Sequence, residues 1–125
     1  MTDLNLENKK ILIVEDDDLS FLYLNQLFLI TKGTVIRQKT GIDALDDFRL
    51  SNNYDLILMD IQLPDMDGKQ VTREIRKINS GIPIIAQTAS RSAHEKDLIL
   101  ESGCTDLLSK PFSIDEFFRT IAKYI

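Results

Sequence analysis

The stretch Tyr54-Asp55-Leu56-Ile57-Leu58-Met59-Asp60 decides the fold of this chain. It is an apolar run that ends in a carboxylate, and residues 61–68, which follow it, contain Pro64 and Gly68 and are therefore expected to form a loop. A short apolar run between turn signals is typical of a strand that is buried on both faces of a parallel sheet. A charged group at the end of such a strand costs desolvation free energy unless another group compensates it. We therefore expect residues elsewhere in the chain to compensate Asp60.

Strand-like and helix-like segments alternate five times along the chain. The expected strands cover Lys10–Val14, Thr34–Gln38, Tyr54–Asp60, Ile82–Thr88 and Asp106–Ser109, and the expected helices cover Leu19 to about Ile30, Gly41 to about Leu50, Gly68 to about Ile78, Ala93–Ser102 and the segment after Ser113. This alternation predicts an α/β fold in which βα units with right-handed crossovers build a parallel sheet. For five strands the doubly wound order 2-1-3-4-5 is expected, with helices on both faces and the more polar second strand at an edge.

The totals fit one globular domain. The chain has 125 residues, of which 43% are hydrophobic and 28% are charged. Residues 1–8 are polar, and we expect them to be a tail or linker before a domain that spans residues 9–125. The net charge of −5 argues against nucleic-acid binding by this domain. A single cysteine, Cys104, fits a reducing, cytoplasmic compartment, and no apolar run approaches the length of a membrane span, so no membrane contact is expected.

Polar or charged residues follow four of the expected strands at the points where they end. Glu15 and Asp16 follow the first strand, Asp60 ends the third, Thr88 ends the fourth and Lys110 follows the fifth. Because the carboxyl ends of parallel strands meet at one edge of the sheet, we expect these side chains to share a crevice. Carboxylates that lie close together cannot all stay ionised unless a cation joins them.

The residue types at this edge favour phosphoryl chemistry that depends on a metal ion. A site with only oxygen ligands selects Mg²⁺, for which Mn²⁺ can substitute, over zinc. A carboxylate can also attack phosphorus and form an aspartyl phosphate. Asp60 is the expected acceptor, with Lys110 and the Thr88 hydroxyl holding the phosphoryl oxygens, and Glu15 and Asp16 as metal ligands.

Four motifs together resemble the receiver domains of two-component response regulators. They are Ile11-Leu12-Ile13-Val14-Glu15-Asp16-Asp17, the run from Leu58 to Gly68, Thr88-Ala89 and Leu108-Ser109-Lys110-Pro111-Phe112. The resemblance covers about Lys9 to Ile125 and is highest to the receivers of hybrid histidine kinases. The chain is expected to be either a stand-alone receiver or one part of a larger protein. It implies a flavodoxin-like (βα)₅ fold. It also implies Mg²⁺-dependent transfer of phosphate to Asp60 from a histidine of a kinase or phosphotransfer domain.

The resemblance assigns a role to each residue of the crevice. It implies that Asp16, Asp60 and the backbone carbonyl of Gln62 ligate the metal, and that Glu15 acts mainly through water. It implies that Thr88 is the switch hydroxyl. It further implies that Lys110 pairs with Asp60 or its phosphate and that the Lys110-Pro111 peptide is cis. The chain is then not an ordinary enzyme but a switch that promotes its own phosphorylation and dephosphorylation.

Leu107 departs from the receiver pattern. Many receivers carry an aromatic residue three positions before the lysine, where this chain has Leu107. The resemblance implies that phosphorylation changes the face formed by the fourth helix, fifth strand and fifth helix, but a rotating aromatic side chain cannot report that change here. How the switch is read out is therefore open at this point.

The expected first helix is more apolar than one buried face requires. Its outward residues, for which we take Tyr23 and Phe28, are expected to form the docking surface of the kinase or phosphotransfer domain. The competing interpretation is core burial with some ordinary exposed apolar surface. A homodimer is a further expected assembly. Asp17 or Asp18 is expected to cap this helix, and both are expected to serve as caps rather than take part in the chemistry.

Three other functions are weighed against the receiver. A receiver-like interaction module without phosphotransfer is disfavoured because all the acidic, hydroxyl and lysine positions are present. A flavodoxin-like cofactor binder is disfavoured because carboxylates follow the first strand, where they would repel a flavin phosphate. A haloacid-dehalogenase-type phosphatase is disfavoured because Pro64 precedes the Asp65-Met66-Asp67 run and Lys69 follows Gly68, so that run is expected to be a turn and a helix cap.

Overall fold

The computed structural model describes residues 3–51 and 53–125. Met1 and Thr2, which belong to the expected tail, lie outside the described residues. The elements alternate as β1 (Lys10–Val14), α1 (Asp18–Thr31), β2 (Thr34–Gln38), α2 (Gly41–Leu50), β3 (Leu56–Asp60), α3 (Gly68–Ile78), β4 (Ile84–Thr88), α4 (Ala93–Glu101), β5 (Asp106–Ser109) and α5 (Ile114–Ala122). The five strands are parallel and follow the order β2-β1-β3-β4-β5, which confirms the predicted α/β topology.

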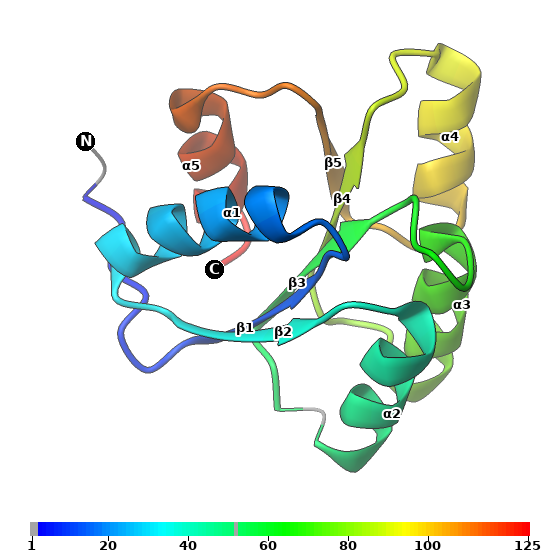
Figure 1. Cartoon of the computed structure of the whole chain (residues 1–125), viewed down its shortest axis with the longest axis horizontal. Coiled ribbons are helices and arrows are strands. Elements are labelled where there is room, and N and C mark those ends of the chain that lie inside the picture. Colours follow the sequence, from blue (N-terminus) through cyan, green and yellow to red (C-terminus); the bar gives the residue numbers. More distant parts are fainter. Residues whose placement is uncertain (1–2, 52) are drawn as a thin grey trace.

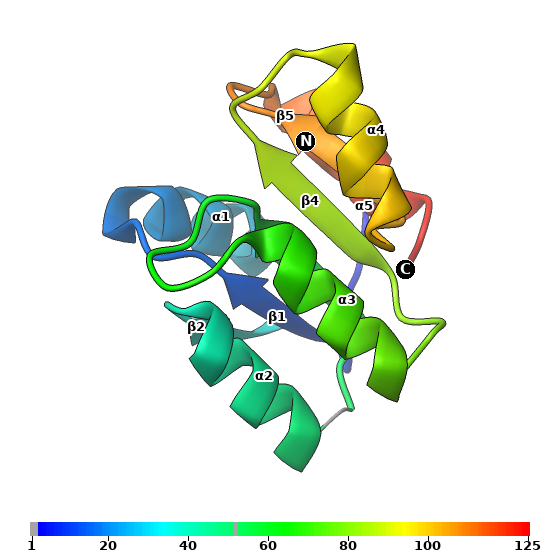
Figure 2. The ribbon, with the colours of Figure 1, turned by 90° about the vertical axis from the view of Figure 1, so that its right-hand side faces the viewer.

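Helices cover both faces of the sheet (Figures 1 and 2). α1 and α5 lie on one face, and α2, α3 and α4 lie on the other. Successive strand residues point to opposite faces, so Ile11 and Ile13 pack with α1 and α5, while Leu12 and Val14 pack with α2 and α3. The central strand β3 is buried along its whole length, whereas β2 is largely half-buried, as its polar sequence predicts for an edge strand.

Two strands are shorter than predicted. β3 begins at Leu56 rather than Tyr54, and β4 begins at Ile84 rather than Ile82. Pro83 has no N–H to give to a ladder, and its carbonyl accepts a hydrogen bond from Ile57 N at 2.9 Å just before β4 begins. The carboxyl ends of both strands, where the candidate residues lie, agree with the prediction.

Leu6, in the segment before β1, belongs to the hydrophobic core. Leu6 is only 1% exposed, and its N–H donates to the carbonyl of Thr31 at 2.7 Å. The polar residues around Leu6 hide this single buried leucine in the sequence. Ile78 at the end of α3 and Ile114 at the start of α5 are exposed by 40% and 49%.

None of the helices in the described ranges is both long and apolar enough to cross a membrane. Cys104 is buried and has a free thiol that lies near the hydroxyls of Thr72 and Ser102.

Candidate functional site

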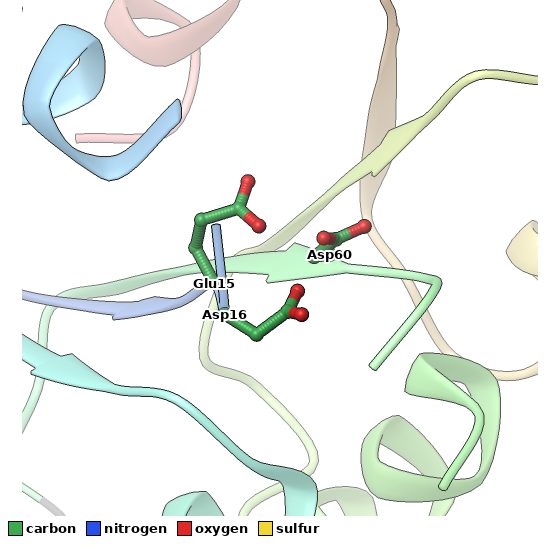
Figure 3. Close-up of side chains that lie close together, drawn as sticks. All are labelled: Glu15, Asp16 and Asp60. Atoms are coloured by element: carbon green, nitrogen blue, oxygen red, sulfur yellow. The ribbon is translucent and has the colours of Figure 1, made fainter. Parts of the chain in front are cut away.

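Three carboxylates gather at the carboxyl ends of the neighbouring strands β1 and β3. Glu15 and Asp16 follow β1, Asp60 ends β3, and one oxygen from each side chain lies within 4.8 Å of the other two (Figure 3). Asp16 is exposed, but Glu15 and Asp60 are only 1% and 7% exposed. Two buried carboxylates therefore lie side by side, as the register of the strands requires.

This crowding changes the acidity of Asp60. Burial and then the neighbouring carboxylate of Glu15 raise the pKa of Asp60 from its ordinary 3.8 to about 7. The ammonium group of Lys110 and the backbone N–H of Gln62 act in the opposite direction, since both stabilise the charged form. The site thus holds more negative charge than its own cation neutralises.

Lys110 lies between the two buried carboxylates. Its Nζ is 3.3 Å from Glu15 Oε1 and 3.9 Å from Asp60 Oδ2. The predicted pairing with Asp60 is therefore shared, and the shorter contact is to Glu15. The backbone N–H of Lys110 donates to the carbonyl of Thr88 at 2.8 Å, and the peptide to Pro111 is cis, as the resemblance implied.

The loop after β3 is held against Asp60. The N–H of Gln62 donates to Asp60 Oδ1 at 3.1 Å, and the N–H of Gly68 donates to the carbonyl of Ile61 at 2.8 Å. Gly68 must be a glycine because a Cβ there would overlap the carbonyl oxygen of Asp60 and lie 2.8 Å from the Cα of Ile61. The Gln62 side chain is exposed, so only its backbone meets the buried carboxylate.

Thr88 ends β4, the strand next to β3, and its side chain is turned to the loop that follows rather than bonded to Asp60. It is 5% exposed, and its Oγ1 accepts a hydrogen bond from Ser90 N at 3.0 Å. Within residues 3–51 and 53–125, no hydrogen bond joins Thr88 to Asp60. A hollow of about 290 Å³ lies at the carboxyl ends of β3 and β4. Gln62, Thr88 and Ser90 are among the residues that line it.

The donor set suits a hard divalent cation. Glu15, Asp16 and Asp60 offer only oxygen atoms, which Mg²⁺ and Mn²⁺ prefer. The raised pKa of Asp60 supplies an independent reason, because a cation at this point would relieve the repulsion between the carboxylates. The residues present therefore fit the metal that the sequence suggested.

The two aspartates that could cap α1 have different roles. Asp17 caps the helix, since its carboxylate accepts a hydrogen bond from Ser20 N at 2.8 Å. Asp18 instead forms ion pairs with Arg37 at 2.9 Å and Lys39 at 3.4 Å on the neighbouring strand β2 and the segment after it. The sequence could not distinguish these roles, because both carboxylates stand at the start of the helix and the partners of Asp18 are distant in sequence.

Asp65 is a structural residue that the sequence did not identify. Its two carboxylate oxygens accept from Gly41 N and Ile42 N, each at 2.8 Å, so it caps α2 from the loop after β3. Asp67 caps α3 by accepting from Lys69 N, as predicted for this run. The loop beside Asp60 is therefore fixed to two helices at once.

The outward face of α1 is apolar, but one of its expected members is not on it. Leu19, Leu22 and Tyr23 are exposed by 77%, 52% and 43%. Phe28 is fully buried and packs edge-on against Phe117 at 5.3 Å between ring centroids, which corrects the expectation that it faces outward. A helix that is apolar on nearly every side gives no sequence signal for which face is buried.

Leu107 is half-buried. It packs against the core cluster on the α2, α3 and α4 side of the sheet, and it also lines a shallow polar hollow between α4 and α5. The position that is often aromatic in receivers therefore belongs partly to the core here.

The family follows from comparisons with known proteins. The profile of the response regulator receiver domain matches residues 11–122. The polar-differentiation response regulator DivK of Brucella ovis is 37% identical over 119 residues, which cover 94% of this chain and 96% of DivK. The receiver domain of a sensor histidine kinase from Pseudomonas aeruginosa PAO1, solved with a magnesium ion coordinated in its active-site cleft, is 33% identical with a TM-score of 0.85 and covers 93% of this chain and 96% of that one.

A further structure agrees in fold alone. The chemotaxis protein CheY4 of Vibrio cholerae superimposes with a TM-score of 0.86 at 23% identity and covers 94% of this chain and 98% of its own. The matching order of motifs, the sheet order and the acidic cluster agree with the sequence relationship. This chain belongs to the response regulator receiver domain family, the signalling switches of two-component systems.

Proposed function

We propose that Asp60 accepts a phosphoryl group from a phosphohistidine of a histidine kinase or phosphotransfer domain. The observation that carries the proposal is the meeting of three carboxylates within 4.8 Å, with the Lys110 ammonium 3.9 Å from Asp60. Asp60 is the proposed acceptor because it alone ends the buried central strand β3 and keeps a direct contact with both the lysine and the Gln62 N–H. The receiver from Pseudomonas aeruginosa, which holds a magnesium ion in its active-site cleft, supports by similarity the metal on which the proposal depends.

The transfer is a substitution at phosphorus. A carboxylate oxygen of Asp60 forms the new P–O bond while the P–N bond to the imidazole of the donor breaks. The electron pair of that bond stays on the imidazole nitrogen, and the ring leaves as neutral imidazole because its other nitrogen carries a proton in the donor. Lys110 is placed to hold an oxygen of the phosphoryl group, and the Thr88 hydroxyl can donate to another after it leaves Ser90 N.

Magnesium is the proposed cofactor. Asp16, Asp60 and the Gln62 carbonyl would hold it, with Glu15 acting mainly through water, and Mn²⁺ would substitute because it prefers the same oxygen ligands. When bound, the metal supplies positive charge that keeps Asp60 ionised and offsets the charge of the phosphoryl oxygens. The chain's own residues orient the carboxylate: Gln62 N–H fixes one oxygen and Lys110 faces the other.

The phosphodonor is proposed to dock on α1. Leu19, Leu22 and Tyr23 present an apolar surface next to the acidic cluster, of the kind that a partner helix covers. Replacing Leu22 with Ser should slow transfer from a phosphotransfer domain much more than labelling by acetyl phosphate. Leu50→Ser is the matched control because Leu50 is 89% exposed at the far end of α2. Equal losses with both donors would argue against docking on α1.

The output is proposed to come from the face formed by α4, β5 and α5. Phosphorylation would draw Thr88 toward the phosphoryl group, and the backbone hydrogen bond from Lys110 N to the Thr88 carbonyl transmits that movement to β5. Leu107 lies on this strand and packs into the core, so a change in packing rather than a rotating aromatic ring would report it.

Beryllofluoride, which mimics an acyl phosphate, tests the proposal. Amide spectra of the wild type and Asp60→Asn are recorded with beryllofluoride and with or without Mg²⁺. We expect changes around residues 60–62, 88–90 and 106–110 of the wild type only when Mg²⁺ is present, and none in Asp60→Asn. No metal-dependent change would favour the alternative of a receiver-like interaction module without phosphotransfer.

A further inference from the structure

The Asp16 side chain lies with the other carboxylates although no side-chain contact holds it there. It is exposed, and among the described residues its carboxylate takes part in no hydrogen bond or ion pair. One of its oxygens nevertheless lies within 4.8 Å of an oxygen of Glu15 and of one of Asp60 (Figure 3). A side chain that no partner holds takes its direction from the backbone that carries it. The place of the Asp16 carboxylate therefore depends on how the backbone at residues 15 and 16 is fixed.

That backbone is fixed by the edge strand β2. The N–H of Glu15 donates to the carbonyl of Gln38 at 3.0 Å, and the carbonyl of Glu15 accepts from Arg37 Nε at 3.0 Å. The second of these bonds comes from a side chain rather than from the strand ladder. The Glu15 carbonyl and the Asp16 nitrogen belong to one planar peptide unit. Arg37 therefore fixes the orientation of the peptide from which Asp16 extends.

The guanidinium group of Arg37 is held by two further contacts. Its Nη2 lies 2.9 Å from Asp18 Oδ1, its Cζ lies 4.5 Å from the centre of the Phe21 ring, and the side chain is only 17% exposed. Within the described part of the chain Nη2 makes no aligned hydrogen bond, so the contact with Asp18 is an ion pair. A planar guanidinium can donate, form an ion pair and lie on a ring at the same time. Arg37 thus holds both ends of the acidic run 15–18 against β2.

We propose that Arg37 is a positioning residue of the magnesium site, which acts through the Glu15 carbonyl to aim the Asp16 carboxylate at the metal. The proposal rests on the magnesium site of the proposed function and adds a residue that does not touch the metal. The positive charge of Arg37 acts in the opposite direction, because a cation near the carboxylates repels Mg²⁺. Loss of Arg37 should therefore weaken Mg²⁺ binding if its position matters and strengthen it if only its charge matters.

Titrations with Mg²⁺ alone measure this sign. The ion is added to the wild type, Arg37→Met and Lys39→Met, and the amide resonances of residues 15–18 and 60–62 are followed. Arg37→Met should raise the Kd for Mg²⁺ about tenfold, as expected when a group that orients a metal ligand is lost. Lys39→Met is the matched control, since Lys39 pairs with the same Asp18 at 3.4 Å but is 59% exposed. Its Kd should stay within about twofold of the wild type, because solvent screens its charge.

A merely structural role would give a different result. Arg37→Met also loses the contacts with Asp18 and Phe21, so its unfolding free energy should fall, and a structural role would change that quantity alone. An unchanged or lower Kd in folded Arg37→Met overturns the proposal. Arg37→Lys keeps the charge, but its ammonium group cannot serve all three partners at once, so this variant should also weaken Mg²⁺ binding. An affinity equal to that of the wild type would overturn the role of the guanidinium geometry, and Arg37→Lys decides the question if Arg37→Met does not fold.

Labelling by acetyl phosphate separates this proposal from the proposed function. In Arg37→Met the Mg²⁺ concentration that gives half-maximal labelling should rise about tenfold. The rate at saturating Mg²⁺ should stay within about twofold of the wild type, because Asp16 is then held by its bond to the metal. A saturated rate that falls as far as the affinity would overturn a role confined to positioning the metal ligand. If the wild type is not labelled at all, the proposed function is wrong, while the Mg²⁺ titrations still decide the role of Arg37.

Discussion

Gly68 keeps the start of α3 in contact with the backbone of Asp60, and the missing Cβ is what permits this. In Gly68→Ala the new methyl group would overlap the carbonyl oxygen of Asp60, and neither partner is a flexible side chain that could move away. We expect the variant to lose about 1 to 3 kcal/mol of unfolding free energy, measured by urea denaturation.

Gly81→Ala is the control for Gly68. The nearest heavy atom to a Cβ at Gly81 is 3.8 Å away, so the substitution meets no obstacle. Its unfolding free energy should stay within about 0.5 kcal/mol of the wild type. A Gly68→Ala protein as stable as Gly81→Ala would show that the close approach at Asp60 is not tight.

Tyr54 gives the protein a pH dependence on the alkaline side. It is buried and donates to Asp47 Oδ2 at 2.7 Å, and burial together with this hydrogen bond raises its pKa above the ordinary 10.0. Because the unfolded state loses this proton first, the stabilisation is complete below pH 10 and declines as the pH rises further. The difference in unfolding free energy between the wild type and Tyr54→Phe should therefore be constant below pH 10 and narrow above it. A difference that does not change up to pH 11 would contradict this reasoning.

At the scale of single residues, the sequence identified groups by chemistry but not by partner. The carboxylates, hydroxyl and lysine of the crevice could be found because each stands directly after a strand. Three features could not be found: the contact that Lys110 shares with Glu15, the cap that Asp65 provides for α2, and the Gln87 Nε2, which has no acceptor among the described residues. The first two depend on a partner more than 20 positions away in the sequence, and the third depends on the lack of a nearby acceptor. A local sequence pattern contains no information about either.

An ion pair joins the start of α3 to the start of α4. Lys69 Nζ lies 2.6 Å from Glu95 Oε1, and the two side chains are only 14% and 28% exposed. A double-mutant cycle with Lys69→Met and Glu95→Gln should give a coupling free energy of about 1 kcal/mol, at the upper end for such pairs because solvent screens them little. Hydrogen exchange at residues 89–95 should become faster in both single variants, since this contact holds the start of α4.

The pair Glu74–Lys77 is the control for that cycle. It has a similar distance of 2.7 Å but lies within α3, and its side chains are 33% and 71% exposed. Its coupling free energy should be about 0.3 kcal/mol. Equal coupling free energies for the two pairs would mean that the ion pair between α3 and α4 stabilises the protein no more than an exposed pair within one helix.

At the scale of elements, the strands and helices were predictable where periodicity and breakers agree. The predicted starts of the helices that a Ser or Asp caps, and the predicted ends of the apolar strands, lie within two residues of their positions in the structure. The buried face of α1 was not, because apolar residues occupy nearly all of its sides and only tertiary packing decides that Phe28 faces inward. The burial of Leu6 was missed because two leucines, Leu4 and Leu6, in a short polar segment are too few to establish a period.

At the scale of the whole molecule, the parallel sheet explains why the site exists. Side chains 15, 60, 88 and 110 come from four different strand ends, and the order β2-β1-β3-β4-β5 makes those ends adjacent. The alternation of strands and helices was enough to predict this order, since connection rules leave few alternatives. The pKa of Asp60, raised to about 7, is the physical consequence of that gathering.

Chemical trapping of the phosphorylated residue tests the central claim most directly. The chain is incubated with acetyl phosphate and Mg²⁺, reduced with borohydride, which converts an aspartyl phosphate to homoserine, and digested for peptide mass spectrometry. The account predicts homoserine at position 60 alone, and only when both the phosphodonor and Mg²⁺ are present. Conversion at Asp16 instead, a reduced product at Glu15, or homoserine at position 60 that forms equally well without Mg²⁺ would contradict it.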